Sequence, residues 1–196
     1  MSYRPITDVW ILARAKLKNG RKYYGAYLGG FPERARRLLG VTIKDPVLHV
    51  CGGAAKDYPY RNGFGVNDKT MDLDPEVNPD ILHDVRKAFP LPLKYTDPCG
   101  HVSPYDQVLT WKPKAYLCDP PYSPEDAKNY IVGRDVYPSP SLILKNCFNV
   151  MNSGERAGII HYLVPKPPKN SIFIACIGII CGFSNRIRAY SVFEKI

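Results

Sequence analysis

The residues best suited to chemistry in this chain are Asp119, Pro120, Pro121 and Tyr122, which directly follow the apolar run Ala115–Cys118. The run predicts a buried strand, and prolines, which cannot donate to a sheet, end it. Because proline fixes φ, the carbonyls of this segment point in set directions. The carboxylate and a proline carbonyl can together accept both hydrogens of an exocyclic amino group, while the tyrosine ring stacks on the heterocycle that carries it.

Acceptors placed in this way aim the lone pair of the amine at an electrophile. The segment resembles the motif of the amino methyltransferases that use S-adenosylmethionine, which is D/N/S-P-P-Y/F/W at the end of the fourth strand. The Asp-Pro-Pro-Tyr form is typical of the adenine-N6 enzymes. The resemblance implies that residues 119–122 are catalytic. It also implies an α/β, Rossmann-like class I methyltransferase fold, in which a mostly parallel sheet ends in an antiparallel hairpin.

A second segment fits the same interpretation, because the buried strand predicted within Pro46–Ala54 runs directly into a pair of glycines. In doubly wound folds the backbone approaches a ligand closely at the carboxyl end of the first strand. The resemblance places the S-adenosylmethionine loop here and assigns His49, Cys51, Gly52 and Gly53 to cofactor binding. The sequence departs from the family pattern, which usually has an aromatic residue at position 51 and alternating rather than adjacent glycines.

Two further carboxylates follow in the expected order. Residues 70–75 predict a second strand that ends in an acid, twenty residues after the first glycine. This is the spacing at which a carboxylate meets the ribose hydroxyls of a nucleotide-like ligand, so we assign Asp72 to that role, with Asp74 in reserve. Residues 79–84 predict a short third strand, and the resemblance places Asp84 near the adenine of the cofactor.

Positive charge is concentrated at the start of the chain. Residues 1–44 contain ten Lys or Arg against two acidic residues, which accounts for +8 of the total net charge of +9. Such a segment is typical of a surface that binds a polyanion. Pro32 and Gly40 predict a helix between them. Its predicted solvent-facing side carries our candidates for phosphate contact, Arg34, Arg36 and Arg37.

The remaining elements complete the predicted fold. We expect residues 93–113 to form a loop at the mouth of the site, and the loop after residue 122 to contact a base or its phosphates through Tyr130 and Arg134. A helix is predicted from Ser139 to Met151 and a fifth strand over 157–164. The final hairpin is predicted from the segments 172–181 and 186–194.

The length of 196 residues and the 45% hydrophobic content predict one methyltransferase domain over 1–196, with the basic segment 1–44 packed on or next to it. The longest apolar run, Ile172–Cys181, is too short to cross a bilayer as a helix. We therefore expect a cytoplasmic protein without membrane association. Six cysteines without a C-x-x-C pair predict reduced thiols and no metal site.

The main functional hypothesis is an adenine-N6 methyltransferase acting on DNA or RNA, which must flip the base out of any duplex. The length leaves no room for a target-recognition domain, so a homodimer or a recognition subunit is a further expectation. Methylation of a small molecule or of a protein amide stays open, although related enzymes for those acceptors prefer N-P-P-Y. The irregular glycine pair also leaves open a catalytically weak or inactive nucleic-acid-binding or partner module with the same fold.

Overall fold

The computed structural model describes residues 4–13, 27–53, 55–57, 63–91, 93–95, 109–128, 137–181 and 186–196. The strands of the main sheet are β1 (Ile6–Leu12), β2 (Val47–Val50), β3 (Lys69–Asp72), β4 (Ile81–Leu82), β7 (Ala115–Cys118), β8 (Arg156–His161), β9 (Ser171–Cys181) and β10 (Ile187–Lys195). A separate pair is formed by β5 (Leu93–Tyr95) and β6 (Leu109–Trp111). The helices are α1 (Phe31–Leu39), α2 (Pro124–Ala127) and α3 (Pro140–Val150), with 3₁₀ turns η1 (Ala55–Asp57) and η2 (Pro75–Val77).

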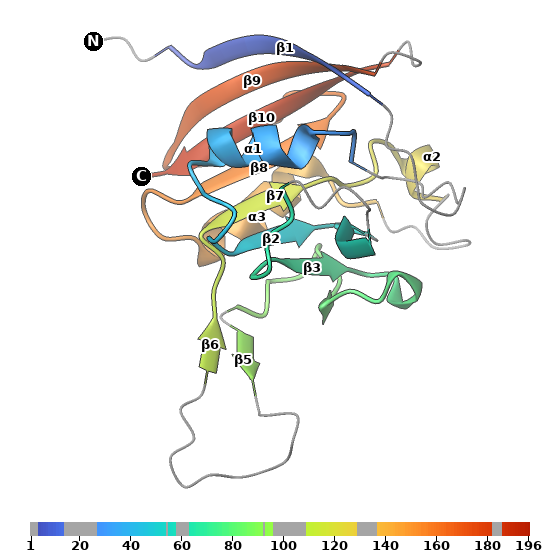
Figure 1. Ribbon diagram of the computed structural model, residues 1–196, viewed down its shortest axis with the longest axis vertical. Helices are drawn as coiled ribbons and strands as arrows, with labels where there is room; N and C mark the ends of the chain where they lie inside the picture. Colours follow the sequence, from blue (N-terminus) through green and yellow to red (C-terminus); the bar gives the residue numbers. More distant parts are fainter. Residues whose placement is uncertain are drawn as a thin grey trace, which may run out of the picture.

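The eight strands follow the order β1-β9-β10-β8-β7-β2-β3-β4. Every described pairing in this sheet is parallel except those of β10, which runs antiparallel to both of its neighbours, β8 and β9. The final hairpin, β9–β10, therefore folds back so that the last strand lies inside the sheet (Figure 1). This confirms the predicted Rossmann-like fold with its C-terminal antiparallel hairpin.

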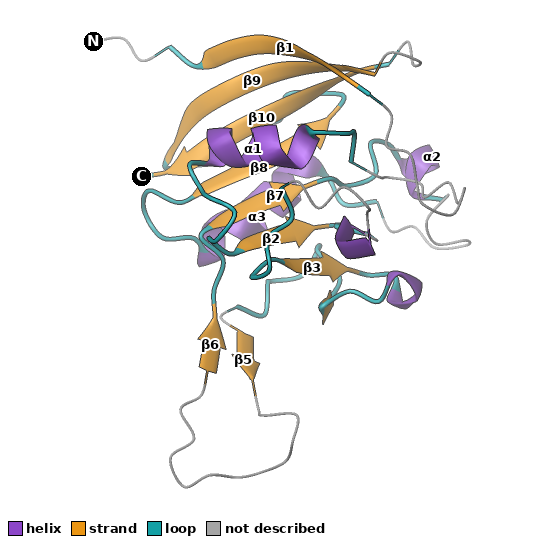
Figure 2. Ribbon diagram, in the orientation of Figure 1, coloured by secondary structure: helices purple, strands orange, loops and turns teal. Residues whose placement is uncertain are grey.

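The central strands β2 and β7 are buried on both faces, which explains why they read as continuous apolar runs. Successive side chains of β2 and β7 alternate between two cores. One core contains Val47, Ala115 and Leu117 together with residues of α1, and the other contains Leu48, Val50, Tyr116 and Cys118 together with residues of α3. Figure 2 shows α1 in front of the sheet and α3 behind it.

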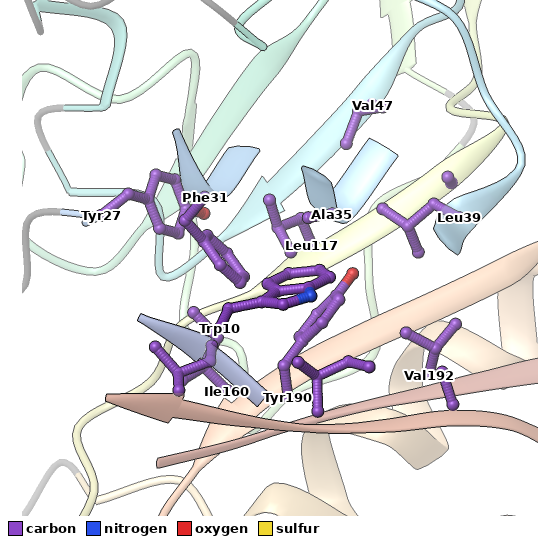
Figure 3. Packing of buried hydrophobic residues seen from close by; sticks show 14 of the residues in the cluster. Trp10, Tyr27, Phe31, Ala35, Leu39, Val47, Leu117, Ile160, Tyr190 and Val192 are labelled. Atoms are coloured by element: carbon purple, nitrogen blue, oxygen red, sulfur yellow. The ribbon is translucent and has the colours of Figure 1, made fainter. Parts of the chain in front are cut away.

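The first core is centred on three large rings from separate elements (Figure 3). The Phe31 ring of α1 lies 5.0 Å from the Tyr190 ring of β10 in an edge-to-face arrangement, and the Trp10 ring of β1 lies 6.3 and 6.2 Å from them. Rings at these separations add to the stabilisation from burial. The same contacts attach β1 and α1, both from the basic segment 1–44, to the main sheet.

Both long helices match their predicted bounds. Helix α1 has Pro32 in its first turn and ends at Gly40, whose φ of 71° is the left-handed conformation that glycine adopts without a steric penalty. Helix α3 begins after Ser139, whose side chain accepts a hydrogen bond from the backbone N–H of Leu142. No helix among the described residues is long and apolar enough to cross a bilayer.

The prediction for residues 93–113 is wrong in its described part. Trp111 donates its indole N–H to the carbonyl of Asn67, 3.0 Å away, and Lys114 donates its backbone N–H to the carbonyl of Pro46 at 2.9 Å. Both carbonyls lie just before β3 and β2, at the amino edge of the sheet. The β5–β6 pair therefore contacts the sheet at its amino edge, and Figure 1 shows the pair projecting away below the sheet.

Candidate active site

The candidate site lies where the connections of two adjacent parallel strands diverge. After β2 the chain continues to β3 and β4 on one side, and it then returns to form β7 on the other side of β2. Such a switch point creates a crevice at the carboxyl ends of the strands, where ligands bind in open α/β sheets. The residues that leave these two ends are Cys51–Gly53 after β2 and Asp119–Tyr122 after β7.

Strand register places three predicted residues side by side at this edge. Val50 pairs with Cys118 on β7 and with Met71 on β3, and each strand then advances by one residue. The backbone N–H of Asp119 donates to the carbonyl of Val50 at 3.1 Å, which extends the pairing. The structure thus brings Cys51, Asp72 and Asp119 together, as the motif order predicted.

The glycine turn after β2 is tight and partly strained. Cys51 has a φ of 54°, a conformation uncommon for a residue with a side chain, and Gly53 has a φ of 49°. A Cβ on Gly52 would lie 2.8 Å from the carbonyl oxygen of His49, so this glycine is required by the turn itself. A Cβ on Gly53 would meet no atom of the described residues within 4 Å, which leaves space there for a ligand.

Asp72 connects this turn to β3. Its Oδ2 accepts from the backbone N–H of Gly53 at 2.9 Å, and its Oδ1 accepts from the backbone N–H of Asp74 at 3.1 Å. Burial raises the pKa of Asp72, although these backbone hydrogen bonds act in the opposite direction. Each carboxylate oxygen can accept a second hydrogen bond, so Asp72 retains capacity for ribose hydroxyls. Asp74 instead caps η2 by accepting from Glu76 N at 2.9 Å.

Asp84 is already paired in the structure. Arg86 donates to it through Nε at 2.9 Å and through Nη2 at 2.8 Å, and these hydrogen bonds lower the pKa of the Asp84 carboxyl. Asp84 follows β4, the next strand beyond β3, so it lies on the expected side of the crevice. Any contact with a cofactor would have to share a carboxylate that Arg86 already holds.

His49 does not have the position predicted for a cofactor ligand. Its side chain is 1% exposed, with Nδ1 3.2 Å from the hydroxyl of Tyr27 and Nε2 3.2 Å from Oδ2 of Asp68. Both ring nitrogens are therefore occupied inside the protein. The prediction that the His49 side chain binds cofactor is wrong, and its contacts give it a structural role.

The prediction of a solvated arginine face on α1 holds for Arg34 and Arg37 and fails for Arg36. Arg34 and Arg37 are exposed, and Arg37 pairs with Glu33 at 2.7 Å. Arg36 is only 5% exposed and forms a buried ion pair with Asp68. A phosphate cannot reach this guanidinium, because its hydrogen bonds are used within the protein.

The Arg36–Asp68 pair is the centre of a buried network. Arg36 also donates to the carbonyls of Gly63 at 2.6 Å and Thr42 at 2.7 Å, and Asp68 also accepts from the backbone N–H of Val47 at 3.0 Å. Burial alone would raise the pKa of Asp68, but hydrogen bonds from His49 and Arg36 lower it below its usual value. The network ties α1 to the start of β2 and to the loop before β3.

The catalytic motif itself is compact. The Tyr122 hydroxyl donates to Oδ1 of Asp119 at 2.7 Å, which fixes the orientation of the carboxylate. Burial raises the pKa of Asp119 to about 6, although the Tyr122 hydrogen bond and the positive charge of Arg188 both lower it. The group is therefore mostly ionised at neutral pH and can act as an acceptor.

Side chains that the sequence analysis did not identify surround the Tyr122 ring. Its ring centroid lies 4.8 Å from that of Tyr162 and 6.0 Å from that of His161, and the Arg188 guanidinium carbon lies 5.0 Å from it. The His161 Nε2 is in turn 3.3 Å from the hydroxyl of Tyr137. Only the strand order β7-β8-β10 reveals this grouping, because the contributing segments are distant in sequence.

Two of the predicted nucleic-acid contacts, Tyr130 and Arg134, lie outside the described residues. Within the described ranges no three His, Cys, Asp or Glu side chains group closely enough to hold a metal ion.

Neither protein-family models nor curated proteins show a match to this sequence. Solved structures do: TrmN from Thermus thermophilus aligns with 88% of this chain at 14% identity and a TM-score of 0.58. This chain spans 50% of TrmN. The Escherichia coli protein yhhF aligns at 10% identity and a TM-score of 0.49, covering 94% of this chain and 98% of yhhF. An rRNA methylase from Streptococcus thermophilus aligns at 9% identity and a TM-score of 0.45, covering 83% of this chain and 95% of the methylase. The likeness to TrmN shows that the chain has the class I methyltransferase fold.

Proposed function

We propose that this protein is an S-adenosylmethionine-dependent methyltransferase that acts on an exocyclic amino group, the N6 of adenine in DNA or RNA. A fold alone does not determine an activity, so the proposal rests on the site. The observation that carries it is the alignment of Asp119–Tyr122 with the Cys51–Gly53 turn and Asp72 at the carboxyl ends of three adjacent strands.

The cofactor would occupy the β2 and β3 side of the crevice. When bound, S-adenosylmethionine supplies an electrophilic methyl group. Gly53 offers open space beside its backbone, and Asp72 offers free acceptor capacity for the ribose hydroxyls. Asp84 follows at the next strand, where the adenine of the cofactor is expected. Cys51 contributes through its backbone, since its conformation sets the direction of the turn.

The acceptor amine would lie on the β7 side. Its two hydrogens are donated to the Asp119 carboxylate and to the Pro120 carbonyl, while its heterocycle stacks on Tyr122. Asp119 polarises the amine and does not deprotonate it beforehand, because an aryl amine is a far weaker acid than a carboxylic acid. The extra proton on nitrogen after methyl transfer passes to Asp119. Alignment of two bound reactants in a dehydrated site supplies much of the rate.

Nucleic acid is the proposed acceptor because of the basic segment and its exposed arginines. Arg34 and Arg37 remain candidates for phosphate contact, as do Tyr130 and Arg134, and Arg36 is excluded by its burial. A target adenine within a duplex has to be flipped out of the stack before it can reach Asp119.

The test is incubation of the protein with isotope-labelled S-adenosylmethionine and either DNA or RNA, followed by mass spectrometry of the nucleosides. Labelled N6-methyladenine is expected with the wild-type protein. Asp119→Ala should lower the rate by at least about 10²-fold, because it removes a preorganised acceptor. Glu76 is an exposed carboxylate on η2, so Glu76→Ala serves as the matched control and should leave the rate unchanged.

Cofactor binding is measured separately by calorimetry. Asp72→Ala should weaken S-adenosylmethionine binding, and Asp119→Ala should leave it within a few-fold of wild type. Absence of heat with the wild-type protein would favour the nucleic-acid-binding module instead. Equal methyl transfer by Asp119→Ala and wild type would remove the motif from the mechanism.

A further inference from the structure

We infer that Arg188 binds the phosphate of the acceptor nucleotide, so that the substrate is a nucleotide within a nucleic-acid strand and not a neutral amine. The inference rests on the function proposed above and extends it to the class of substrate. It assigns a binding role to β10, the strand that lies between β8 and β9.

Arg188 lacks a hydrogen-bonding or charged partner within the described part of the chain. Its Nε atom is buried and has no hydrogen-bond partner among the described residues. The guanidinium also forms no ion pair within the described part of the chain. A partly buried cation with unused donors is costly unless an anion meets it, so the site is suited to a negatively charged ligand.

The Arg188 guanidinium lies next to the aromatic ring of the proposed acceptor site. Its guanidinium carbon is 5.0 Å from the centroid of the Tyr122 ring, on which the acceptor base is proposed to stack. Burial opposes the charged form of Arg188, but the neighbouring Tyr122 and Asp119 raise its pKa, so it stays positive. Asp119 does not neutralise it by a direct pair, and one oxygen of Asp119 is taken by the Tyr122 hydroxyl.

A second arginine of the same chain segment lies against the neighbouring ring, Tyr162. Arg186 precedes Arg188 by two residues, and its guanidinium lies 5.9 Å from the centroid of the Tyr162 ring and 2.9 Å from the Tyr162 hydroxyl. The Tyr162 and Tyr122 rings are themselves 4.8 Å apart. Arginines interleaved with aromatic rings are the arrangement by which proteins hold single-stranded nucleic acid, with bases on the rings and phosphates on the cations.

A phosphate is the anion that fits this position. In a nucleotide it is separated from the base by a single sugar, so a base on Tyr122 brings its phosphate toward the cation beside that ring. The planar guanidinium can bind phosphate oxygens with two parallel hydrogen bonds. A neutral small-molecule amine or a protein amide would leave Arg188 unpaired, which argues against those acceptors.

The experiment compares Arg188→Gln and Arg188→Lys with wild type, using Lys145→Gln as the control that removes one exposed charge from α3. The probes are a single-stranded adenine-containing DNA or RNA oligonucleotide, free adenosine, and S-adenosylmethionine. Binding of the oligonucleotide is measured at several salt concentrations. Far-ultraviolet circular dichroism checks that each variant is folded, and Arg188→Lys keeps the charge if the Gln variant does not fold.

Arg188→Gln is expected to weaken oligonucleotide binding about tenfold and to reduce the slope of log K against log salt by about 0.7, the contribution of one phosphate contact on a single strand. Arg188→Lys should keep the wild-type salt slope, and Lys145→Gln should match wild type. The affinity for S-adenosylmethionine should stay unchanged in Arg188→Gln.

Two results would overturn the inference. An unchanged salt slope in Arg188→Gln would show that no phosphate is bound there, and a loss of S-adenosylmethionine affinity would assign Arg188 to the carboxylate of the cofactor. The proposed function is judged separately. A changed salt slope in Arg188→Gln without methyl transfer to any probe by the wild-type protein would reject the proposed activity and support the phosphate site. Methyl transfer by the wild-type protein with an unchanged salt slope in Arg188→Gln would support the activity and reject the phosphate site.

Discussion

Replacing Asp119 with asparagine should stabilise the folded protein at neutral pH while it slows methyl transfer. Burial raises the pKa of this carboxyl from 3.8 to about 6, so the ionised group that the reaction needs is disfavoured by the folded structure. Asparagine has nearly the same shape and an oxygen that can still accept from the Tyr122 hydroxyl, but it never carries the charge. Stability and activity are therefore expected to change in opposite directions.

The magnitude follows from linkage. Because the pKa is higher in the folded than in the unfolded state, the stability that this group contributes is fully present below about pH 4 and is lost as the pH rises to about 6. A shift of roughly two units corresponds to about 3 kcal/mol at neutral pH. Between pH 4.5 and 7.5, the advantage of Asp119→Asn over wild type should grow by about 2 kcal/mol.

The assay is urea unfolding of both proteins at the two pH values, with the free energy of unfolding obtained by linear extrapolation. Asp45→Asn is the matched control, because hydrogen bonds from Lys114 and Thr42 lower the pKa of Asp45. Its substitution should destabilise the protein, and the loss should be greater at neutral pH than in acid. A difference between Asp119→Asn and wild type that does not vary with pH would refute this account of the buried carboxylate.

Two further predictions concern stability. Asp68→Ala should cost about 3–5 kcal/mol in urea unfolding, because it leaves the buried Arg36 unpaired; a cost below about 1 kcal/mol would show that the network is dispensable. Gly158→Ala should cost about 1–3 kcal/mol, because its Cβ would lie 2.2 Å from the hydroxyl oxygen and 2.6 Å from the ring of buried Tyr190. Gly178→Ala is its control, since the nearest atom there is 3.4 Å away, and equal melting temperatures for the two variants would contradict the prediction.

The parts of the site that could be predicted from the sequence lie at the ends of buried parallel strands. An apolar run stopped by glycine, aspartate or proline marks the carboxyl edge of such a strand, and this pattern located Cys51–Gly53, Asp72 and Asp119. Parallel pairing then brings these ends to one edge without further information. The bounds of α1 and α3 were equally local, because Gly40 and Ser139 act on adjacent backbone.

The errors came from contacts between distant segments. The sequence predicts Arg36 to be a surface residue, because the loop that carries its partner Asp68 is distant in sequence. The same Asp68 carboxylate binds the buried His49 ring, which is therefore not available to a cofactor. The polar composition of 93–113 indicated a loop without showing which edge of the sheet it leaves. Arg188 could be found only once β10 was known to lie beside β8, since nothing in its local sequence indicates a ligand.

Because β10 lies inside the sheet, the packing of the first core also determines the orientation of the Arg188 side chain. Arg188, Tyr190 and Val192 stand at every second position of β10, so their side chains share one face of the sheet. Tyr190 and Val192 are fully buried. A slip of one residue would turn all three to the opposite face of the sheet. Burial of Tyr190 and Val192 therefore fixes the orientation of the Arg188 guanidinium toward the Tyr122 ring. A mutation deep in the core can displace this guanidinium without changing any residue of the crevice.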